Sequence, residues 1–218
     1  WCFVVARTDP FTSQHHGLTY LLVPMDQDGF HVRPIRQPTG SEEFSELFFE
    51  GARTDRDLVV GDVGSGWRVA MGTLGFERGV GSLGMQVGFA TELDDLIALA
   101  RRTERLDDPQ LRADLARAWS EVRIMRFNAQ RSLSAAADGP PGAAASISKL
   151  YWSQWFQRFG ELAMRVRGSA GLASADGPLD RVQQTFLFGR AVTIFAGSSE
   201  IQRNILSESV LGLPRDPR

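Results

Sequence analysis

Residues 195–214 read FAGSSEIQRNILSESVLGLP, and this stretch changes character in its middle. Segment 196–199 is small, flexible and rich in hydroxyl groups, whereas residues 200–211 carry apolar side chains at helical spacing: Ile201, Ile205, Val210 and Leu211. Ser199 with Gln202 three residues later fits a capping box, so a helix is expected to begin here. Such a turn before a helix offers backbone N–H groups to an anion. An ordinary capped helix at the C-terminal end explains the same pattern.

The bulk composition is that of a globular protein. The chain has 218 residues, of which 43% are hydrophobic and 23% charged, with a net charge of −2. This balance predicts no nucleic-acid partner. The single cysteine, Cys2, excludes an internal disulfide and indicates a reducing compartment. No apolar run reaches 18 residues and no signal peptide is visible, so we expect no membrane span and no secretion.

The first part of the chain reads as β-structure and the rest as helix. Turn signals separate four strand-like runs, at residues 1–7, 18–24, 30–35 and 44–50. A glycine-rich link, Gly61–Gly66, precedes helical periodicity, so we place a domain boundary between residues 62 and 63. The chain starts without methionine in what reads as the middle of a strand. We therefore expect a fragment that lacks an N-terminal portion.

Long apolar stripes follow the link and predict an antiparallel helical bundle. The first stripe runs from Trp67 to Ala100 and includes Met71, Leu74, Val87, Leu93 and Leu96. Asp107, Asp108 and Pro109 are expected to cap a second helix with a buried face of Leu111, Leu115, Trp119, Val122 and Met125. A third helix is expected over residues 147–166, after a loop at 139–142, and a fourth apolar segment covers 179–195.

The stretch that begins at Phe195 resembles the C-terminal signature of acyl-CoA dehydrogenases, usually written Gly-Thr-Ser-Glu-Ile-Gln-Arg-Asn. Residues 21–25, 48–53 and 66–70 are similar to segments of that family's β domain and domain junction. The resemblance implies an α+β multi-domain fold, with a partial antiparallel β-barrel or sandwich followed by an antiparallel four-helix bundle. Residues 1–62 would be the C-terminal part of the middle β domain, and 63–218 the bundle.

The family's chemistry implies a function. Its members remove an α-proton from an acyl-CoA thioester, transfer the β-hydrogen as hydride to FAD, form a trans-2-enoyl-CoA and pass electrons to an electron-transferring flavoprotein. They are rarely monomeric, so the resemblance implies a homodimer, homotetramer or heterotetramer. It also implies a bacterial-type cytoplasm or a mitochondrial matrix as the location, and a role in lipid metabolism such as fatty acid β-oxidation.

The resemblance assigns the catalytic base to Glu77. Many members carry the basic glutamate at the position of Ala196, which has no acid here. The isovaleryl and long-chain branches instead carry it early in the long helix as a Glu-Arg pair, and they too have alanine at the other position. This chain has Glu77-Arg78, so Glu77 is the expected base and Arg78 is expected beside the substrate. An exposed helical glutamate in an ion pair is the alternative.

The helix around Glu77 is rich in glycine. Five glycines fall within 13 residues: Gly72, Gly75, Gly79, Gly81 and Gly84. Each glycine inside a helix costs about 1 kcal/mol relative to alanine. Close packing of helices explains them, or the missing side chains leave space beside the base for a wide acyl group.

Other site residues follow from the same resemblance. The backbone N–H of Ala196, with Gly197, is expected to bind the thioester carbonyl. Ser198, Ser199 and Glu200 fall where the family contacts FAD, usually that of a neighbouring subunit. Arg102 and Gly168 stand in the two other flavin segments.

Those two segments depart from the family pattern. Arg102 lacks the following Phe-Gly, and the glutamine of the family's Gln-x-x-Gly-Gly is replaced by arginine at Arg165. These changes put FAD binding between subunits in doubt and raise the alternative of a hetero-oligomer in which only some interfaces carry flavin. The arginines near these segments would pair with pyrophosphate or CoA phosphates, or be solvated.

Further interpretations stay open or are set aside. A flavin-poor partner subunit and a related flavin oxidase remain alternatives to the dehydrogenase, whereas the acidic balance argues against a DNA-associated member. His15 and His16 lack acidic or cysteine partners at ligand spacing, so no metal site is expected. Cys2 lies in an apolar run and is expected to be inert.

Overall fold

A computed structural model describes residues 1–136, 143–173 and 177–215, without the side chains of residues 75–83, 135–136 and 143–146. The chain divides into two compact units. One comprises residues 1–37 and 41–77, and the other residues 38–40 and 78–218. The division falls inside one helix, α1 (Gly66–Arg102). No helix in the described ranges is long and apolar enough to cross a membrane.

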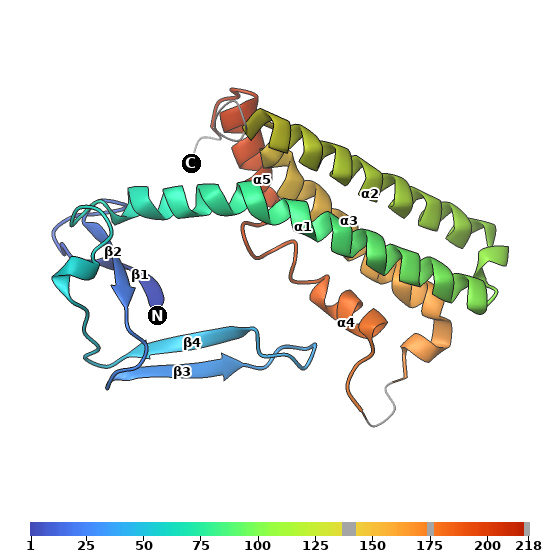
Figure 1. Ribbon diagram of the computed structural model, residues 1–218, viewed down its shortest axis with the longest axis horizontal. Coiled ribbons are helices and arrows are strands. Elements are labelled where there is room, and N and C mark those ends of the chain that lie inside the picture. The colour runs from blue at the N-terminus through green and yellow to red at the C-terminus, as the bar shows by residue number, and fades with distance from the viewer. Residues whose placement is uncertain (137–142, 174–176, 216–218) are drawn as a thin grey trace. The chain divides into compact units, whose positions relative to one another are not determined.

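The first unit contains two antiparallel hairpins (Figure 1). Strand β1 (Cys2–Arg7) pairs with β2 (Leu18–Val23), and β3 (Phe30–Ile35) pairs with β4 (Phe44–Phe49). These bounds agree with the four predicted runs to within one residue. Alternating and β-branched residues bounded by turns account for the agreement. A short 3₁₀ turn, η1 (Arg56–Leu58), follows the second hairpin.

The glycine-rich link allows α1 to begin against strand β2. A Cβ on Gly66 would lie 2.5 Å from the backbone carbon of Thr19 and 2.5 Å from the backbone nitrogen of Tyr20, so only glycine fits. Thr19 is buried, and its hydroxyl lies 2.6 Å from the Thr8 hydroxyl and accepts the Gly64 N–H at 3.0 Å. The link is thus a packed junction.

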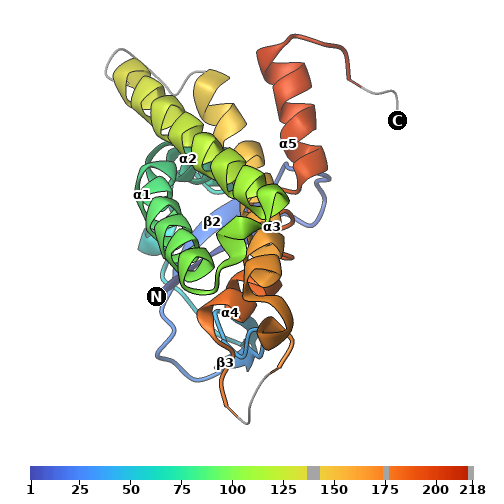
Figure 2. The same ribbon diagram turned by 90° about the vertical axis from the view of Figure 1, so that its right-hand side faces the viewer.

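The second unit is helical. In addition to the rest of α1 it contains η2 (Arg105–Asp107), α2 (Pro109–Ala136), α3 (Ala143–Arg167), η3 (Gly168–Gly171), α4 (Arg181–Phe188), α5 (Ser199–Ile205) and a π-helical turn, η4 (Leu206–Val210). Figures 1 and 2 show α2 alongside α3, with the shorter α4 and α5 also next to α3. This is the expected arrangement of short antiparallel strands followed by a helical domain.

One apolar core joins the three long helices. It contains Leu93, Leu96 and Ala100 of α1, Leu111, Leu115 and Val122 of α2, and Trp155, Phe159 and Val166 of α3. The Trp155 ring stacks on Phe159 with centroids 4.8 Å apart, and its N–H donates to the Ala118 carbonyl at 3.2 Å. Burial of each large apolar side chain contributes roughly 1.5–3 kcal/mol. The predicted cap is also confirmed, because the Asp108 carboxylate accepts the N–H of Gln110 at 2.8 Å.

Some predicted core residues are wrong. Val87 is 66% exposed, because the buried face of α1 runs through Phe89, Leu93 and Leu96, and Val87 lies about 200° around the helix from Phe89. Trp119 is 47% exposed at the edge of its face, where the Arg123 guanidinium covers its ring. In the first unit Trp67, Met71 and Leu74 also remain more than a third exposed.

The fourth apolar segment contains much less helix than its length suggests. Helix α4 ends at Phe188, and residues 190–196 continue as turns. Arg190 is tied to α3, since its guanidinium binds the Glu161 carboxylate at 3.0 Å and the Gln157 carbonyl at 3.2 Å. The residues after Phe188 are therefore held against α3 by Arg190 and do not extend helix α4. The loop expected at 139–142 lies outside the described residues.

Candidate functional site

The turn before α5 has an unusual backbone. Ala196 has φ of 53° and Gly197 has φ of 93°, so two consecutive residues are left-handed. This region is strained for alanine and free for glycine. In the described part of the chain, neither the Ala196 N–H nor the Gly197 N–H has an acceptor. The turn thus presents two backbone donors beside an exposed alanine.

Hydrogen bonds across the turn keep it in this conformation. The Ser199 N–H donates to the Thr193 carbonyl at 3.2 Å, and the Gln202 side-chain amide donates to the Ala196 carbonyl at 3.2 Å. Gln202 is only 4% exposed. A Cβ on Gly197 would lie 2.5 Å from the Gln202 side-chain nitrogen, so the glycine leaves room for this bond.

The capping box predicted at Ser199 is wrong by one residue. Ser198 is the N-cap, and its hydroxyl oxygen accepts the Ile201 N–H at 3.4 Å. Ser199 is the first residue of the helix and is buried. The expected partner, Gln202, does not reach back to the cap, because its amide binds the Ala196 carbonyl instead.

Lys149 connects the turn region to α3. Its ammonium donates to the Val192 carbonyl at 2.7 Å and lies 5.0 Å from the centroid of the Trp152 ring and 5.8 Å from that of Phe195. Burial lowers the pKa of Lys149. The residue therefore holds a partly desolvated cation against the backbone four residues before Ala196.

Glu200 lies in the first turn of α5 and is exposed. The pKa of its carboxyl is lowered, first by the hydrogen bond from its own backbone N–H and then by one from the Ser198 hydroxyl. Glu200 is therefore an anion that accepts hydrogen bonds. It suits a sugar hydroxyl or an amide, and it does not suit a phosphate.

A second cluster lies where α1 and α3 end. Gly168 has φ of 65°, and a Cβ there would clash with the guanidinium of Arg105. Arg102 is exposed and lines a groove of about 340 Å³ together with Arg167 and Arg181. Arg167 pairs with Asp180 at 3.0 Å, and Arg181 pairs with Glu92. Among the described residues the Arg167 Nε is buried without a partner, which leaves one donor of this groove unused.

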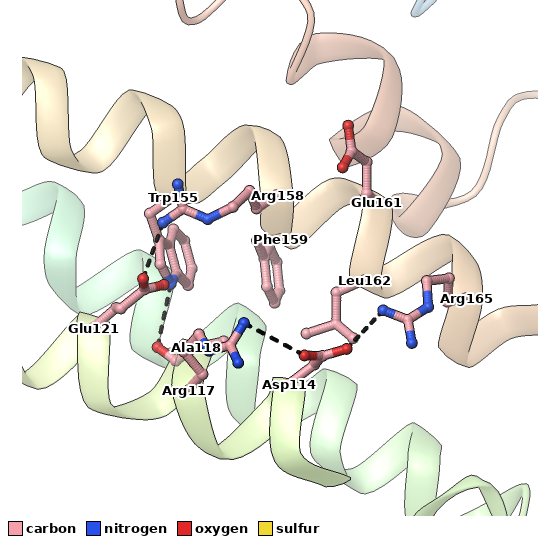
Figure 3. A pocket seen from close by; sticks show the side chains of 10 residues that line it. All are labelled: Asp114, Arg117, Ala118, Glu121, Trp155, Arg158, Phe159, Glu161, Leu162 and Arg165. Atoms are coloured by element: carbon pink, nitrogen blue, oxygen red, sulfur yellow. Dashed lines mark hydrogen bonds and ion pairs between the residues drawn. The ribbon is translucent and has the colours of Figure 1, made fainter. Parts of the chain in front are cut away.

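Arg165, the residue in place of the family's glutamine, lies in another groove, of about 240 Å³, between α2 and α3 (Figure 3). Its guanidinium binds Asp114 at 2.7 Å. This hydrogen bond is the main reason that the pKa of Asp114 is lowered. Arg117 and Arg158, which also line the groove, pair with acidic residues of α2 (Asp114 and Glu121). The three arginines of this groove thus pair with carboxylates of the same chain, so their charges are already compensated without a phosphate ligand.

The two clusters lie at opposite ends of α3. Lys149, near the start of α3, holds the segment that leads to Ala196, whereas Gly168 directly follows the last residue of the helix. A 25-residue helix is about 38 Å long. Figure 1 shows α5 and the end of α3 well apart. Ser198 and Arg102 of one chain therefore do not meet in one small site.

A comparison with protein families gives the affiliation. The family model described as acyl-CoA dehydrogenase, C-terminal domain, matches residues 64–211. The chain belongs to the acyl-CoA dehydrogenase family. The resemblance read from residues 195–214 is thereby confirmed.

Relatives in the family are similar over the whole chain. Acyl-CoA dehydrogenase IpdE1 of Mycobacterium tuberculosis is 54% identical over 218 residues, which are 100% of this chain and 56% of that protein. Acyl-CoA dehydrogenase IpdE1 of Mycolicibacterium smegmatis is 51% identical over 99% of this chain and 54% of its own length. The chain thus spans little more than half the length of these relatives.

Solved structures of the family share the fold. The Tcur3481-Tcur3483 steroid ACAD superposes with a TM-score of 0.87 at 27% identity, over 98% of this chain and 56% of that one. The ChsE4-ChsE5 complex from Mycobacterium tuberculosis gives a TM-score of 0.83 at 24% identity, over 98% of this chain and 57% of that one. Each of these two proteins is named as a pair of different chains.

The predicted base and its neighbour belong to α1, but their side chains lie outside the described residues. Glu77 as the base and Arg78 as a substrate contact therefore stay predictions. The same holds for Gly75, Gly79 and Gly81. Gly72 and Gly84 are described, and a Cβ at either would meet no atom within 4 Å in the part of the chain that the structure covers. Within that part of the chain, no close helix contact accounts for those two glycines.

Sequence reasoning missed three residues that shape these clusters. Lys149 and Arg105 act on backbone far from them in sequence, at Val192 and Gly168, so no local pattern marks them. One signal for Lys149 was available, because it is the only lysine among 24 basic residues. Gln202 belongs to the signature, but the capping-box pattern predicts a contact with the helix cap for it, whereas its amide binds the Ala196 carbonyl.

Proposed function

We propose that the full-length protein dehydrogenates an acyl-CoA thioester between Cα and Cβ to give a trans-2-enoyl-CoA, using FAD and passing the electrons to an electron-transferring flavoprotein. Membership of the family supports this function. The observation that carries it is the turn at Ala196 and Gly197, a strained backbone with two N–H groups that have no acceptor among the described residues.

The turn suits the charge that develops in this reaction. As the α-proton leaves, negative charge moves to the thioester oxygen, and a fixed backbone donor stabilises that charge. The Ala196 N–H would donate to the thioester carbonyl, with Gly197 beside it. No side chain is needed for this role, which agrees with alanine at this position.

Glu77 would take the α-proton. A glutamate serves as a base for this weak acid only where desolvation raises its pKa. The motif Gly75-Phe76-Glu77-Arg78 and the absence of an acid at Ala196 support this assignment together. Arg78 would contact the substrate next to the base.

The flavin would be held by two chains. Ser198 caps α5 with its hydroxyl oxygen and donates the hydroxyl proton to Glu200, so the Glu200 carboxylate next to it is the group that would accept a hydrogen bond from the flavin, with Ser199 beside it. At the other end of α3 the exposed Arg102 lines a groove together with Arg167, the residue before Gly168, and provides the cation that a pyrophosphate requires, so the donor types present fit FAD. When bound, FAD accepts the β-hydrogen as hydride. The separation of the two sets by α3 favours contacts to two different flavins.

We further propose a wide acyl group as the substrate. Gly72 and Gly84 leave open space beside α1 among the described residues. A relative of known structure at 27% identity is named as a steroid ACAD. A CoA thioester of a steroid carboxylic acid therefore fits better than a straight fatty acyl chain.

The experiment is anaerobic mixing of the full-length, FAD-loaded protein with butyryl-CoA, octanoyl-CoA, palmitoyl-CoA, isovaleryl-CoA and choloyl-CoA. We expect the flavin absorbance near 450 nm to bleach with the steroid thioester and not in the Glu77→Gln variant, by analogy with other general-base substitutions, which cost about 10²–10⁴-fold. Bleaching of the variant at the wild-type rate would exclude Glu77 as the base. Absence of bleaching by all five thioesters would contradict the dehydrogenase.

A second candidate is a flavin-poor subunit that completes the site of a different chain. The departures at Arg102 and Arg165 favour it, as does the pairing of Arg165 with Asp114 inside the chain. Both solved relatives described above are named as pairs of chains. The FAD content of the purified full-length protein distinguishes the candidates, because this candidate predicts well below one flavin per chain until a partner is added.

A further inference from the structure

Lys149 is unusual in composition and in position. It is the only lysine in a chain with 24 basic residues. Its ammonium is in contact with two aromatic rings, and it donates a 2.7 Å hydrogen bond to the carbonyl of Val192, which is 1% exposed. A buried carbonyl needs a donor, and a compact ammonium on a narrow stem fits between rings better than a planar guanidinium.

The carbonyl that it binds begins the segment leading to the strained turn. Val192 is four residues before Ala196, whose φ of 53° persists only if its surroundings enforce it. Two further bonds act on the turn, from Ser199 to the Thr193 carbonyl and from Gln202 to the Ala196 carbonyl. Both come from α5 itself, so they do not fix the turn to the core.

Lys149 comes from α3, which lies in the centre of the helical unit. The same helix contributes Trp155 and Phe159 to the core, so its backbone is anchored. The Phe195 ring, directly before the turn, packs against Phe188 with centroids 5.8 Å apart and also faces the Lys149 ammonium. Among the described residues, Lys149 therefore connects α3 to the segment that leads into the turn, and so fixes this segment relative to α3.

We propose that Lys149 is a positioning residue that orients the Ala196 N–H toward the thioester carbonyl, an inference that rests on the function proposed above. The ammonium contacts neither the substrate nor the flavin in this role. It holds the Val192 carbonyl, and thereby the start of the segment whose end presents the two backbone donors.

The test compares the Lys149→Met and Lys149→Arg variants of the full-length, FAD-loaded protein. Methionine keeps an apolar stem and loses the donor, whereas arginine keeps a donor and a charge. Arg112→Met is the matched control, because Arg112 also donates to a backbone carbonyl, that of Leu106 at 2.9 Å, away from the turn. Hydrogen exchange of peptides covering residues 193–200 is measured beside flavin reduction by the five thioesters named above.

We expect Lys149→Met to speed amide exchange in residues 193–200 by about tenfold or more, with exchange in α2 unchanged. Its rate of flavin reduction should fall by a similar factor with little change in the half-saturating thioester concentration. The reason is that a misplaced Ala196 N–H would stabilise the charge on the thioester oxygen less well in the transition state, while binding of the thioester changes little. Lys149→Arg should lie between this variant and the wild type, and Arg112→Met should leave both readouts of the turn unchanged.

Three results would overturn the inference or separate it from the proposed function. Unchanged exchange in Lys149→Met excludes any hold on the turn. Faster exchange with unchanged reduction excludes the positioning role. If no thioester reduces the wild-type flavin while exchange still rises in Lys149→Met, the proposed function fails and the hold of Lys149 on the turn is supported. If Lys149→Met does not fold, Lys149→Arg decides by the same two measurements.

Discussion

At the scale of single residues, Ala196 and Gly197 make different contributions to one turn. Both are left-handed, but a side chain at Gly197 would also meet the Gln202 amide. Strain at Ala196 costs roughly 1–2 kcal/mol and is compensated by the bonds on either side of it. Strained non-glycine residues cluster at functional sites, and here the strained turn contains two N–H groups that have no acceptor among the described residues.

The Gly197→Ala substitution tests this account. We expect a loss of roughly 2–4 kcal/mol in the free energy of unfolding, from backbone strain together with the clash at Gln202. Gly64→Ala is the matched control, because Gly64 has a similar φ of 87° but no atom within 4 Å of a built Cβ in the described chain. It should lose only roughly 1–2 kcal/mol, from strain alone. Equal losses in denaturant titrations would show that the Gln202 contact is unimportant.

A second residue-scale prediction concerns the width of the substrate site. Gly84→Leu fills space that is open among the described residues, so reduction by choloyl-CoA should fall more than tenfold while smaller thioesters are affected less. Gly84→Ala, which restores helix propensity and adds only a methyl group, is the control for helix propensity. The comparison is made by stopped-flow flavin reduction. An equal loss for every thioester would contradict a wide acyl pocket at Gly84.

At the scale of elements, the start of α1 is set by one close approach. Gly66 lies against the backbone of β2, whereas Gly72, six residues later, has open space among the described residues. The two glycines therefore have opposite consequences in the same helix. Gly66 permits close packing, whereas Gly72 meets no described neighbour and lowers the helix propensity of α1.

We accordingly expect Gly66→Ala to destabilise the first unit by roughly 2–4 kcal/mol, because neither the helix nor the strand can move without breaking the junction. Gly72→Ala should stabilise it by about 1 kcal/mol through helix propensity. Thermal unfolding of the two variants and the wild type is the measurement. A stable Gly66→Ala protein would contradict the close contact with Thr19 and Tyr20.

The ion pair between Asp114 of α2 and Arg165 of α3 makes the free energy of unfolding depend on pH. Arg165 lowers the pKa of Asp114 in the folded protein, so the unfolded chain binds more protons at acidic pH. The contribution is complete above the unfolded pKa and is lost as the pH falls through the folded value, that is, below about pH 4. The partial exposure of both side chains limits it to under about 1 kcal/mol.

The Asp114→Asn variant checks this sign. Its free energy of unfolding should lie below that of the wild type at pH 7, and the difference should shrink toward zero as the pH falls below about 3. Glu42→Gln, at an exposed position in the first unit, is the control and should show no such convergence. A difference that grows with acidity would refute the ion pair as its source.

At the scale of the whole molecule, the proposed function has the two clusters at the ends of α3 contact two different flavins, so that the flavin site would be shared between chains. About 38 Å of helix separates Gly168 from the start of α3, near which Lys149 holds the turn. On this proposal, a chain on its own would offer each flavin only part of its contacts. FAD binding and assembly are then linked by mass action.

FAD retention should consequently fall on dilution of the full-length protein, in parallel with dissociation of the oligomer. The Arg102→Ala variant should lose FAD at a protein concentration about tenfold higher than the wild type, since one charge-assisted contact is removed. Flavin fluorescence and mass photometry across a dilution series follow the two events. Arg101→Ala is the control for charge. Retention of FAD by fully dissociated chains would exclude a shared site.

Local sequence patterns were sufficient to predict the strands, most of the helices and the family. The four strand bounds follow from alternation and turns, the cap at Asp108 from local chemistry, and the family from a contiguous signature, because all of these are encoded within a few neighbouring residues. The position of the turn at Ala196 and Gly197 could also be predicted from the contiguous signature. The residues that contact this turn from distant parts of the chain could not be predicted from it.

The way in which the turn is held depends on tertiary structure. Lys149 reaches Val192 across 43 positions, and Arg105 covers Gly168 across 63, so neither contact leaves a periodic trace in sequence. The helix cap also depends on tertiary structure. The local pattern predicts Ser199 as the cap, but Ser198 is the cap in the structure, and the Gln202 amide donates to the Ala196 carbonyl instead of binding the cap. Local patterns fix which backbone can form, and competition among distant groups for the same hydrogen-bonding partners fixes where it is anchored.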